Sequence, residues 1–254
     1  MPIDVKNLTL SVQKTAALIT HGNALLSIAG DEHLLKQLPA GNWIAGSIPY
    51  FMSEKGGVKT TDSLFVTVIK GSTGFQLETY NSATLSTVAS DAAKWGFTLL
   101  VMPAGSDVHV SYAQDSPTYE DMFDSPIIGW VSGVDVDDIG KKTPTVFCGS
   151  KPGAPIADGA VALHIAMPDD CMAHIDIMNC FEPDLSGENV EFLSEGFEVK
   201  DVLVAGKRVN FAEYLRQKNI DSKLPLISDN SGVLVNVSIK LSMMTLLLYT
   251  HRCF

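Results

Sequence analysis

The chain has 254 residues, of which 46% are hydrophobic and 19% charged, and this composition excludes a disordered protein. Its formal net charge of -11 disfavours nucleic acid and anionic membranes as partners, because like charges repel. The longest apolar run, residues 243–249, is too short to span a bilayer, and residues 1–6 lack the pattern of a secretory signal. We therefore expect a cytoplasmic protein that binds neither nucleic acid nor a membrane.

Helix and strand patterns alternate in the first half of the chain. The clearest helix pattern covers residues 82–95, where apolar residues recur at i, i+3, i+4 and i+7 before Gly96. A second helix pattern covers residues 11–20, with Ser11 as its N-cap. The other expected elements are strands over residues 24–29, 42–48, 63–69 and 97–102, a short helix after Asp31 and an irregular helix over residues 118–123.

Successive strand patterns joined by turns fill the second half, which is typical of an antiparallel meander. Asn210 and Glu213 have the spacing of a capping box at the start of a helix. The expected strands cover residues 127–135, 145–148, 159–167, 172–181, 190–193, 197–204, 224–227 and 232–240. The patterns together predict an α+β or α/β protein with two sheet-rich halves, residues 1–125 and 126–240, and a tail of uncertain order, residues 241–254.

Two apolar runs end in small residues, and the chain is organised around them. They are residues 43–48 (WIAGSI) and residues 127–135 (IIGWVSGVD), and the first is a looser echo of the second. Small residues at the end of a buried strand let the chain turn without strain, or let another group approach the backbone. One weak match of this kind does not by itself establish an internal repeat.

The chain also resembles a known family at four stretches. These are residues 43–48, residues 128–135, residues 145–148 with 158–163, and residues 202–210. In this order they resemble the FIST sensory domain of signal-transduction proteins, over about residues 24–240. The resemblance implies an intracellular module that binds an amino acid or a derivative of one. Because these residues include no recognisable signal-output domain, the signal is expected to pass to a separate partner protein.

The ends of the two runs provide the candidate ligand site. Backbone N–H groups and hydroxyls of the small residues could hold a carboxylate, Asp135 could hold an ammonium group, and Trp43 could form a wall. The alternative is that the glycines only permit close packing between sheets. The candidate ligand-binding residues are Trp43, Gly46, Ser47, Ser132, Gly133 and Asp135.

Two histidines suggest a different class of function. If a hairpin turns near Asp169, His164 and His174 face each other with Asp176 on the same face, and the three could bind a divalent metal ion. The protein would then be a metal-dependent enzyme. No hydrolase or dinucleotide motif occurs, so the sequence assigns no other catalytic residue and predicts no cofactor. A scaffold without a ligand is the third possibility.

Overall fold

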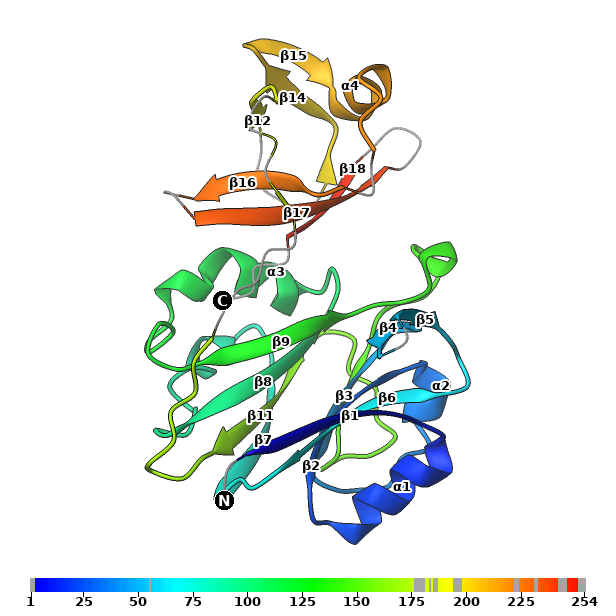
Figure 1. The fold of residues 1–254 in the computed structure, drawn as a ribbon, viewed down its shortest axis with the longest axis vertical. Coiled ribbons are helices and arrows are strands. Elements are labelled where there is room, and N and C mark those ends of the chain that lie inside the picture. Colours follow the sequence, from blue (N-terminus) through cyan, green and yellow to red (C-terminus); the bar gives the residue numbers. More distant parts are fainter. Residues whose placement is uncertain are drawn as a thin grey trace. The chain divides into compact units, whose positions relative to one another are not determined.

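The computed structural model describes residues 3–54, 56–175, 181–182, 184, 187–193, 198–221, 224–230, 233–241 and 246–250 (Figure 1). The chain divides into two compact units, residues 1–175 and residues 176–253. Strands predominate and helices are few, so the expected α+β class is confirmed. The predicted division near residue 125 falls inside the first unit, where strands on both sides of it belong to one sheet.

A five-stranded sheet, called here the first sheet, holds most of the N-terminal segment. Its strand order is β1-β6-β2-β3-β10, and all neighbours are antiparallel except β2 and β3. A hairpin of β4 and β5 precedes β6. The elements of this segment are β1 (Asp4–Leu10), α1 (Val12–His21), β2 (Leu25–Gly30), α2 (Glu32–Leu35), β3 (Trp43–Ser47), β4 (Tyr50–Ser53), β5 (Gly56–Lys59) and β6 (Leu64–Lys70).

A four-stranded sheet, the second sheet, follows in the same unit. Its order is β7-β11-β8-β9, and only β8 and β9 are parallel neighbours. The elements of this segment are β7 (Gly74–Tyr80), the 3-10 helix η1 (Leu85–Thr87), β8 (Gly96–Pro103), α3 (Asp107–Asp115), the 3-10 helices η2 (Ser116–Thr118) and η3 (Val136–Asp138), β9 (Ile127–Ser132), β10 (Val146–Cys148) and β11 (Ala160–Ala166).

The two sheets repeat one topology. In each, the first strand in the chain pairs with the last, the last pairs with the second, and the second runs parallel to the third. The two runs singled out in the sequence are β3 and β9, the third strand of each repeat. The echo in the sequence therefore corresponds to equivalent strands. The exception to the repeat is β10, which lies between β9 and β11 in the chain but pairs with β3 of the first sheet.

Three apolar clusters give the first unit four layers. One cluster packs α1 and α2 against the first sheet, and another packs η1 and α3 against the second sheet. The third cluster includes Ile44 of β3, Val101 of β8 and Leu163 of β11, and it lies where the inner faces of the two sheets meet. Figure 1 shows α1 and α2 on one side of the sheets and α3 on the other.

Local signals in the sequence correctly predicted the positions of several helices and strands. The Ser11 hydroxyl accepts a bond from the backbone of Lys14 at the start of α1, and Gly22 ends that helix with a φ of 67°. Asp31 caps α2 through the backbone of His33, as expected. The expected strands over residues 24–29, 42–48, 63–69 and 97–102 are confirmed as β2, β3, β6 and β8.

The prediction of a helix over residues 82–95 is wrong. This segment contains only η1 and a series of turns, although Leu85, Val88 and Ala89 are buried as the apolar pattern required. Hydroxyl groups explain the difference, since Thr87 donates to the carbonyl of Thr84, and Ser90 donates to the carbonyl of Thr87. Such side-chain bonds compete with the regular backbone ladder of an α-helix.

The helix expected over residues 118–123 does not form. An α-helix, α3, covers Asp107–Asp115 with Ser106 as its N-cap, and residues 119–124 form turns and a bend. Pro117 lies directly after α3 in η2 and favours the end of the helix, because proline lacks a backbone N–H donor. The weak periodicity of this segment comes from its single buried position, Val108.

The described residues of the second unit form two antiparallel sheets and one helix. The sheet orders are β12-β14-β15 and β13-β18-β17-β16. Asn210 caps α4 through the backbone of Glu213, as the capping-box spacing predicted, and Phe211 and Leu215 are buried against β14. The elements are β12 (Val190–Phe192), β13 (Glu198–Val199), β14 (Asp201–Val204), β15 (Lys207–Asn210), α4 (Phe211–Gln217), β16 (Leu226–Asn230), β17 (Val233–Leu241) and β18 (Leu246–Thr250).

Three expectations for the second half need correction. The strands over residues 145–148 and 159–167 do not start a meander, because β10 and β11 join separate sheets of the first unit. Residues 171–175 form no strand, and residues 176–180 of the strand expected over 172–181 lie outside the described residues. The segment 241–254, predicted as a tail of uncertain order, contains the strand β18.

Candidate functional site

The ends of β3 and β9 meet where the two sheets pack together. The Ser47 hydroxyl donates to the carbonyl of Gly133 at 2.9 Å, and the Gly133 N–H donates to the carbonyl of Ser47 at 2.7 Å. The Ser47 hydroxyl also accepts a bond from the backbone N–H of Thr145 at 2.9 Å. The Ser47 hydroxyl and the Gly133 N–H, which could have held a ligand carboxylate, are therefore engaged within the chain.

Gly46 is in close contact with the second sheet. A Cβ atom at this position would lie 2.7 Å from the Trp130 ring, 2.8 Å from Ser132 Cβ and 2.9 Å from a methyl group of Val101. Glycine is therefore required by the packing between the sheets, as the alternative interpretation of the sequence held. Ser132 is fully buried, and its Oγ is one of two buried side-chain polar atoms without a hydrogen-bond partner in the described part of the chain.

Asp135 continues from this junction and holds the β4–β5 hairpin. Its Oδ1 accepts from the Tyr50 hydroxyl at 3.0 Å and from the Asp137 N–H at 3.1 Å, and its Oδ2 lies 2.7 Å from Lys59 Nζ. The Tyr50 hydroxyl accepts in turn from the N–H of Val136. The Lys59 ammonium and these donors lower the pKa of Asp135 to about 2. Both carboxylate oxygens thus have partners within the chain.

The sequence therefore identified a true junction between the two sheets, at which Ser47 and Gly133 bond to each other. The structure brings together Gly46, Ser47, Ser132 and Gly133, with Asp135 two residues beyond. Trp43 lies elsewhere, because it is fully buried under α1 and α2 and donates from Nε1 to the carbonyl of Pro39. Its side chain points to the opposite face of β3 from Gly46, as alternation along a strand requires.

The histidine hairpin does not form. β11 pairs on both sides, so His164 lies beside Gln76 of β7 and Thr98 of β8, while His174 is exposed outside any strand. Asp176, the third expected ligand, lies outside the described residues. Within the described ranges, no group of three or more His, Cys, Asp or Glu side chains is placed to hold a metal ion.

His164 instead belongs to a buried polar network. Its Nε2 lies 2.8 Å from the Tyr80 hydroxyl and its Nδ1 lies 2.8 Å from Thr98 Oγ1. The Tyr80 hydroxyl also lies 3.0 Å from the carboxylate of Asp91. Because that hydroxyl donates its one proton to the carboxylate, it accepts from His164 Nε2–H, and Nδ1 accepts from Thr98. Both ring nitrogens are engaged, and burial lowers the pKa of His164.

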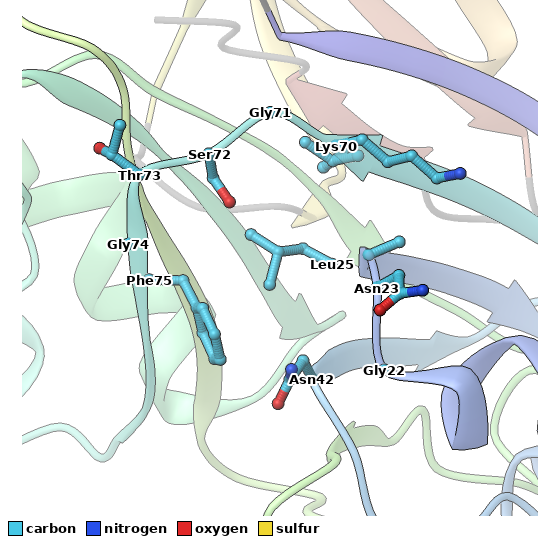
Figure 2. Close-up of a pocket in the computed structure, with 12 residues that line it drawn as sticks. Gly22, Asn23, Leu25, Asn42, Lys70, Gly71, Ser72, Thr73, Gly74 and Phe75 are labelled. Atoms are coloured by element: carbon cyan, nitrogen blue, oxygen red, sulfur yellow. The ribbon is translucent and has the colours of Figure 1, made fainter. Parts of the chain in front are cut away.

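A polar groove opens at the opposite end of β3. It has a volume of about 320 Å³ and lies between the turn before β2, the residue before β3 and the connection from β6 to β7 (Figure 2). Leu25 and Ile69 are its buried apolar residues, and Phe75 is partly exposed beside them. The lining residues are Gly22, Asn23, Ala24, Leu25, Asn42, Ile69, Lys70, Gly71, Ser72, Thr73, Gly74 and Phe75.

The polar side chains of this groove have no partners among the residues that the structure describes. No side-chain hydrogen bond or ion pair joins Asn23, Asn42, Lys70, Ser72 or Thr73 to any other residue of the described ranges. Sequence reasoning missed the groove. The available signal was the run Gly71-Ser72-Thr73-Gly74, which has the composition of an exposed turn and no distinctive spacing.

Comparison with known proteins gives one match. A family model described as a family of unknown function, DUF6976, matches residues 10–245. The chain belongs to DUF6976. The match extends over both units of this DUF6976 protein. No curated protein and no solved structure gives a significant match. None of the helices in the described part of the chain combines the length and the apolar character that crossing a membrane requires.

Proposed function

We propose that this DUF6976 protein is a sensory module that binds a small polar metabolite and passes the signal to a separate partner protein. The groove beside β3 carries the proposal, because the Ser72 hydroxyl points into it (Figure 2) and the polar side chains of its lining have no hydrogen-bond partner among the described residues. Its volume of about 320 Å³ lies at the low end of the range for ligand pockets, roughly 300–1,000 Å³, so a small ligand fits best.

The position of the groove suits a sensor. Leu25 and Ile69 come from the first sheet, Phe75 comes from β7 of the second sheet, and Ser72 lies in the connection between the two sheets. A ligand in this groove would contact both repeats of the first unit. It would shift their relative position if it bound one arrangement more tightly than another, since only differential affinity moves such an equilibrium.

In this proposal the residues at the ends of β3 and β9 hold the two sheets together and do not bind the ligand. The bonds between Ser47 and Gly133 make the junction of β3 and β9 a fixed point. The groove lies at the other end of β3, where no such reciprocal bond occurs between the described residues of the two sheets. We propose a cytoplasmic location, because the free thiols Cys148 and Cys171 suit a reducing compartment.

A thermal-shift screen of the purified protein against amino acids, amines and small organic acids tests the proposal. A ligand at 100 times its dissociation constant adds about 2.7 kcal/mol to the free energy of unfolding, and a protein of this size gains about 2–4 °C per kcal/mol. Ser72→Trp should fill the groove and abolish the response. Ser86→Trp, at an exposed serine outside the groove, should preserve it. A response that survives Ser72→Trp would place the ligand elsewhere.

A further inference from the structure

The outer edge of β9 has no pairing strand among the described residues. β9 is the last strand in the order β7-β11-β8-β9, so one of its two sides pairs with β8 and the other is the edge of the second sheet (Figure 1). The exposed fraction of Ile128 is 45%, and Gly129 beside it is exposed as well. The backbone groups along this edge are therefore accessible to another strand.

The bonds to β8 show which residues of β9 face outward. The carbonyls of Pro126 and Ser132 accept from the N–H groups of Thr98 and Ala104, so the two strands advance equally and their alternation is unbroken. Backbone groups point to opposite sides of a strand at successive residues, so the even-numbered residues of β9 face β8. The outward-facing residues are Ile127, Gly129 and Val131.

The edge of β9 also lacks the features that normally prevent strand pairing. Edge strands in natural proteins carry charges, are very short or are covered by another segment. In the described parts of the first and second sheets, β1 carries Asp4 and Lys6, and β7 carries Glu78. β10 has three residues and is bridged on its outer side by Ile156. β9, with the sequence IIGWVS, has no charged residue.

This edge is complementary to itself. In an antiparallel pair with its two-fold axis at Gly129, Ile127 lies opposite Val131 of the second copy, and Ile128 lies opposite Trp130 of the second copy. The pair of Ile128 and Trp130 is of the non-hydrogen-bonded kind, in which side chains approach most closely. Ile127 and Val131 continue the face that packs against α3, and Trp130 continues the face toward the first sheet. Every opposed pair is apolar, and the glycine at the axis adds no side chain.

From these observations we propose that β9 is a dimerisation edge, on which β9 of a second copy pairs antiparallel and continues the second sheet from one subunit into the other. In the dimer, Trp130 of the second copy covers the exposed Ile128 side chain. A second copy is favoured over another partner because one strand supplies both complementary sides and no charge of either sign opposes its own image. None of the residues that line the groove belongs to β9, so this proposal is independent of the proposed function.

Size-exclusion chromatography with light scattering, on the full chain at submillimolar concentration, tests the proposal. The wild-type protein should have twice the mass of the single chain. Ile128→Glu should raise the dissociation constant of the dimer at least about a hundredfold, because each dimer would bury two carboxylates without partners. Val5→Glu is the matched control. Val5 is 52% exposed on β1, the edge strand of the first sheet, so this variant should remain a dimer.

Hydrogen exchange of the wild-type protein locates the contact without a substitution. The amides of Gly129 and Val131 should be protected at high protein concentration and lose that protection on dilution. The amide of Trp130, which faces β8, should stay protected at both concentrations. A monomer at submillimolar concentration would overturn the proposal. A dimer would overturn it as well if Gly129 and Val131 exchange freely in it, or if Val5→Glu dissociates it and Ile128→Glu does not.

Discussion

Ser47 and Gly133 are bonded to each other twice, through the Ser47 hydroxyl at 2.9 Å and through the Gly133 N–H at 2.7 Å. The two residues stand 86 positions apart in the chain, at the ends of equivalent strands of the two repeats. Because each supplies both a donor and an acceptor, this contact ties the end of β3 in one sheet to the end of β9 in the other.

Gly46→Ala should destabilise the protein by about 1–3 kcal/mol, the usual cost of overpacking a core. The added methyl group would lie within 3 Å of Trp130, Ser132 and Val101. Chemical denaturation measures the change. Gly57→Ala is the matched control, because a Cβ there meets nothing within 4 Å. Equal stability of the two variants would show that the sheets can separate at Gly46 without cost.

Ser47→Ala and Ser132→Ala should have opposite effects. The first removes the donor to Gly133 and the acceptor for Thr145, and we expect a loss of about 1–3 kcal/mol. The second removes a buried hydroxyl that has no partner, so we expect no loss, or a gain of up to about 1 kcal/mol. The unfolding midpoints of the two variants, each compared with that of the wild-type protein, test both expectations. A large loss for Ser132→Ala would imply a bound group that contacts its hydroxyl.

Because of His164, the free energy of unfolding should be lower in mild acid than at neutral pH. The pKa of His164 is lowered in the fold by burial, so the unfolded chain takes up a proton near pH 6.5 while the folded imidazole stays neutral. The free energy of unfolding should therefore fall as the pH drops below about 6.5, and this loss should end below the folded pKa. Denaturation between about pH 5 and pH 8 measures the trend.

The control for this prediction is His164→Gln. Its stability should depend less steeply on pH than that of the wild-type protein, whatever its absolute stability. The partly buried His109, whose pKa is also lowered, is present in both proteins, so the difference isolates His164. Identical slopes for the two proteins would contradict the prediction.

Asp135→Asn should release the β4–β5 hairpin. The variant loses the ion pair with Lys59 and weakens the bond from Tyr50. Faster hydrogen exchange at the amides of Tyr50–Ser53 and Gly56–Lys59 would report the release. In the wild-type protein the contribution of Asp135 to holding the hairpin should likewise be lost as the pH falls from about 3.8 to about 2. The reason is that the pKa of Asp135 in the folded protein is lowered to about 2. Asp138→Asn, which removes only an ion pair with Lys142, is the control.

Strands and caps were predictable because their signals are local. The side chains of Ser11, Asp31 and Asn210 accept hydrogen bonds from backbone N–H groups at the starts of their helices, as predicted. The apolar runs ending at Ser47 and Ser132 form β3 and β9. The helix over residues 82–95 was mispredicted because its apolar spacing is also satisfied by turns. There, threonine and serine hydroxyls compete with the helical backbone ladder.

The candidate site was predictable only in part. Small residues at the ends of β3 and β9 do indicate a close approach, but the sequence cannot tell whether a ligand or another strand approaches. His164 could not be assigned because its partners, Tyr80 and Thr98, come from strands that are distant in the chain. The groove escaped notice because its lining is assembled from three separate segments.

The strand β10 has a consequence for how the chain folds. β3 ends at Ser47, whereas its outer neighbour β10 begins at Val146, about a hundred residues later. At synthesis rates of about 5–20 residues per second, the edge of β3 remains unpaired for roughly 5–20 s before β10 has been synthesised. During this interval the nascent first sheet presents unpaired backbone groups to other chains. We therefore expect truncation before residue 146 to cause aggregation, and pairing of β10 to be a late, slow step of folding.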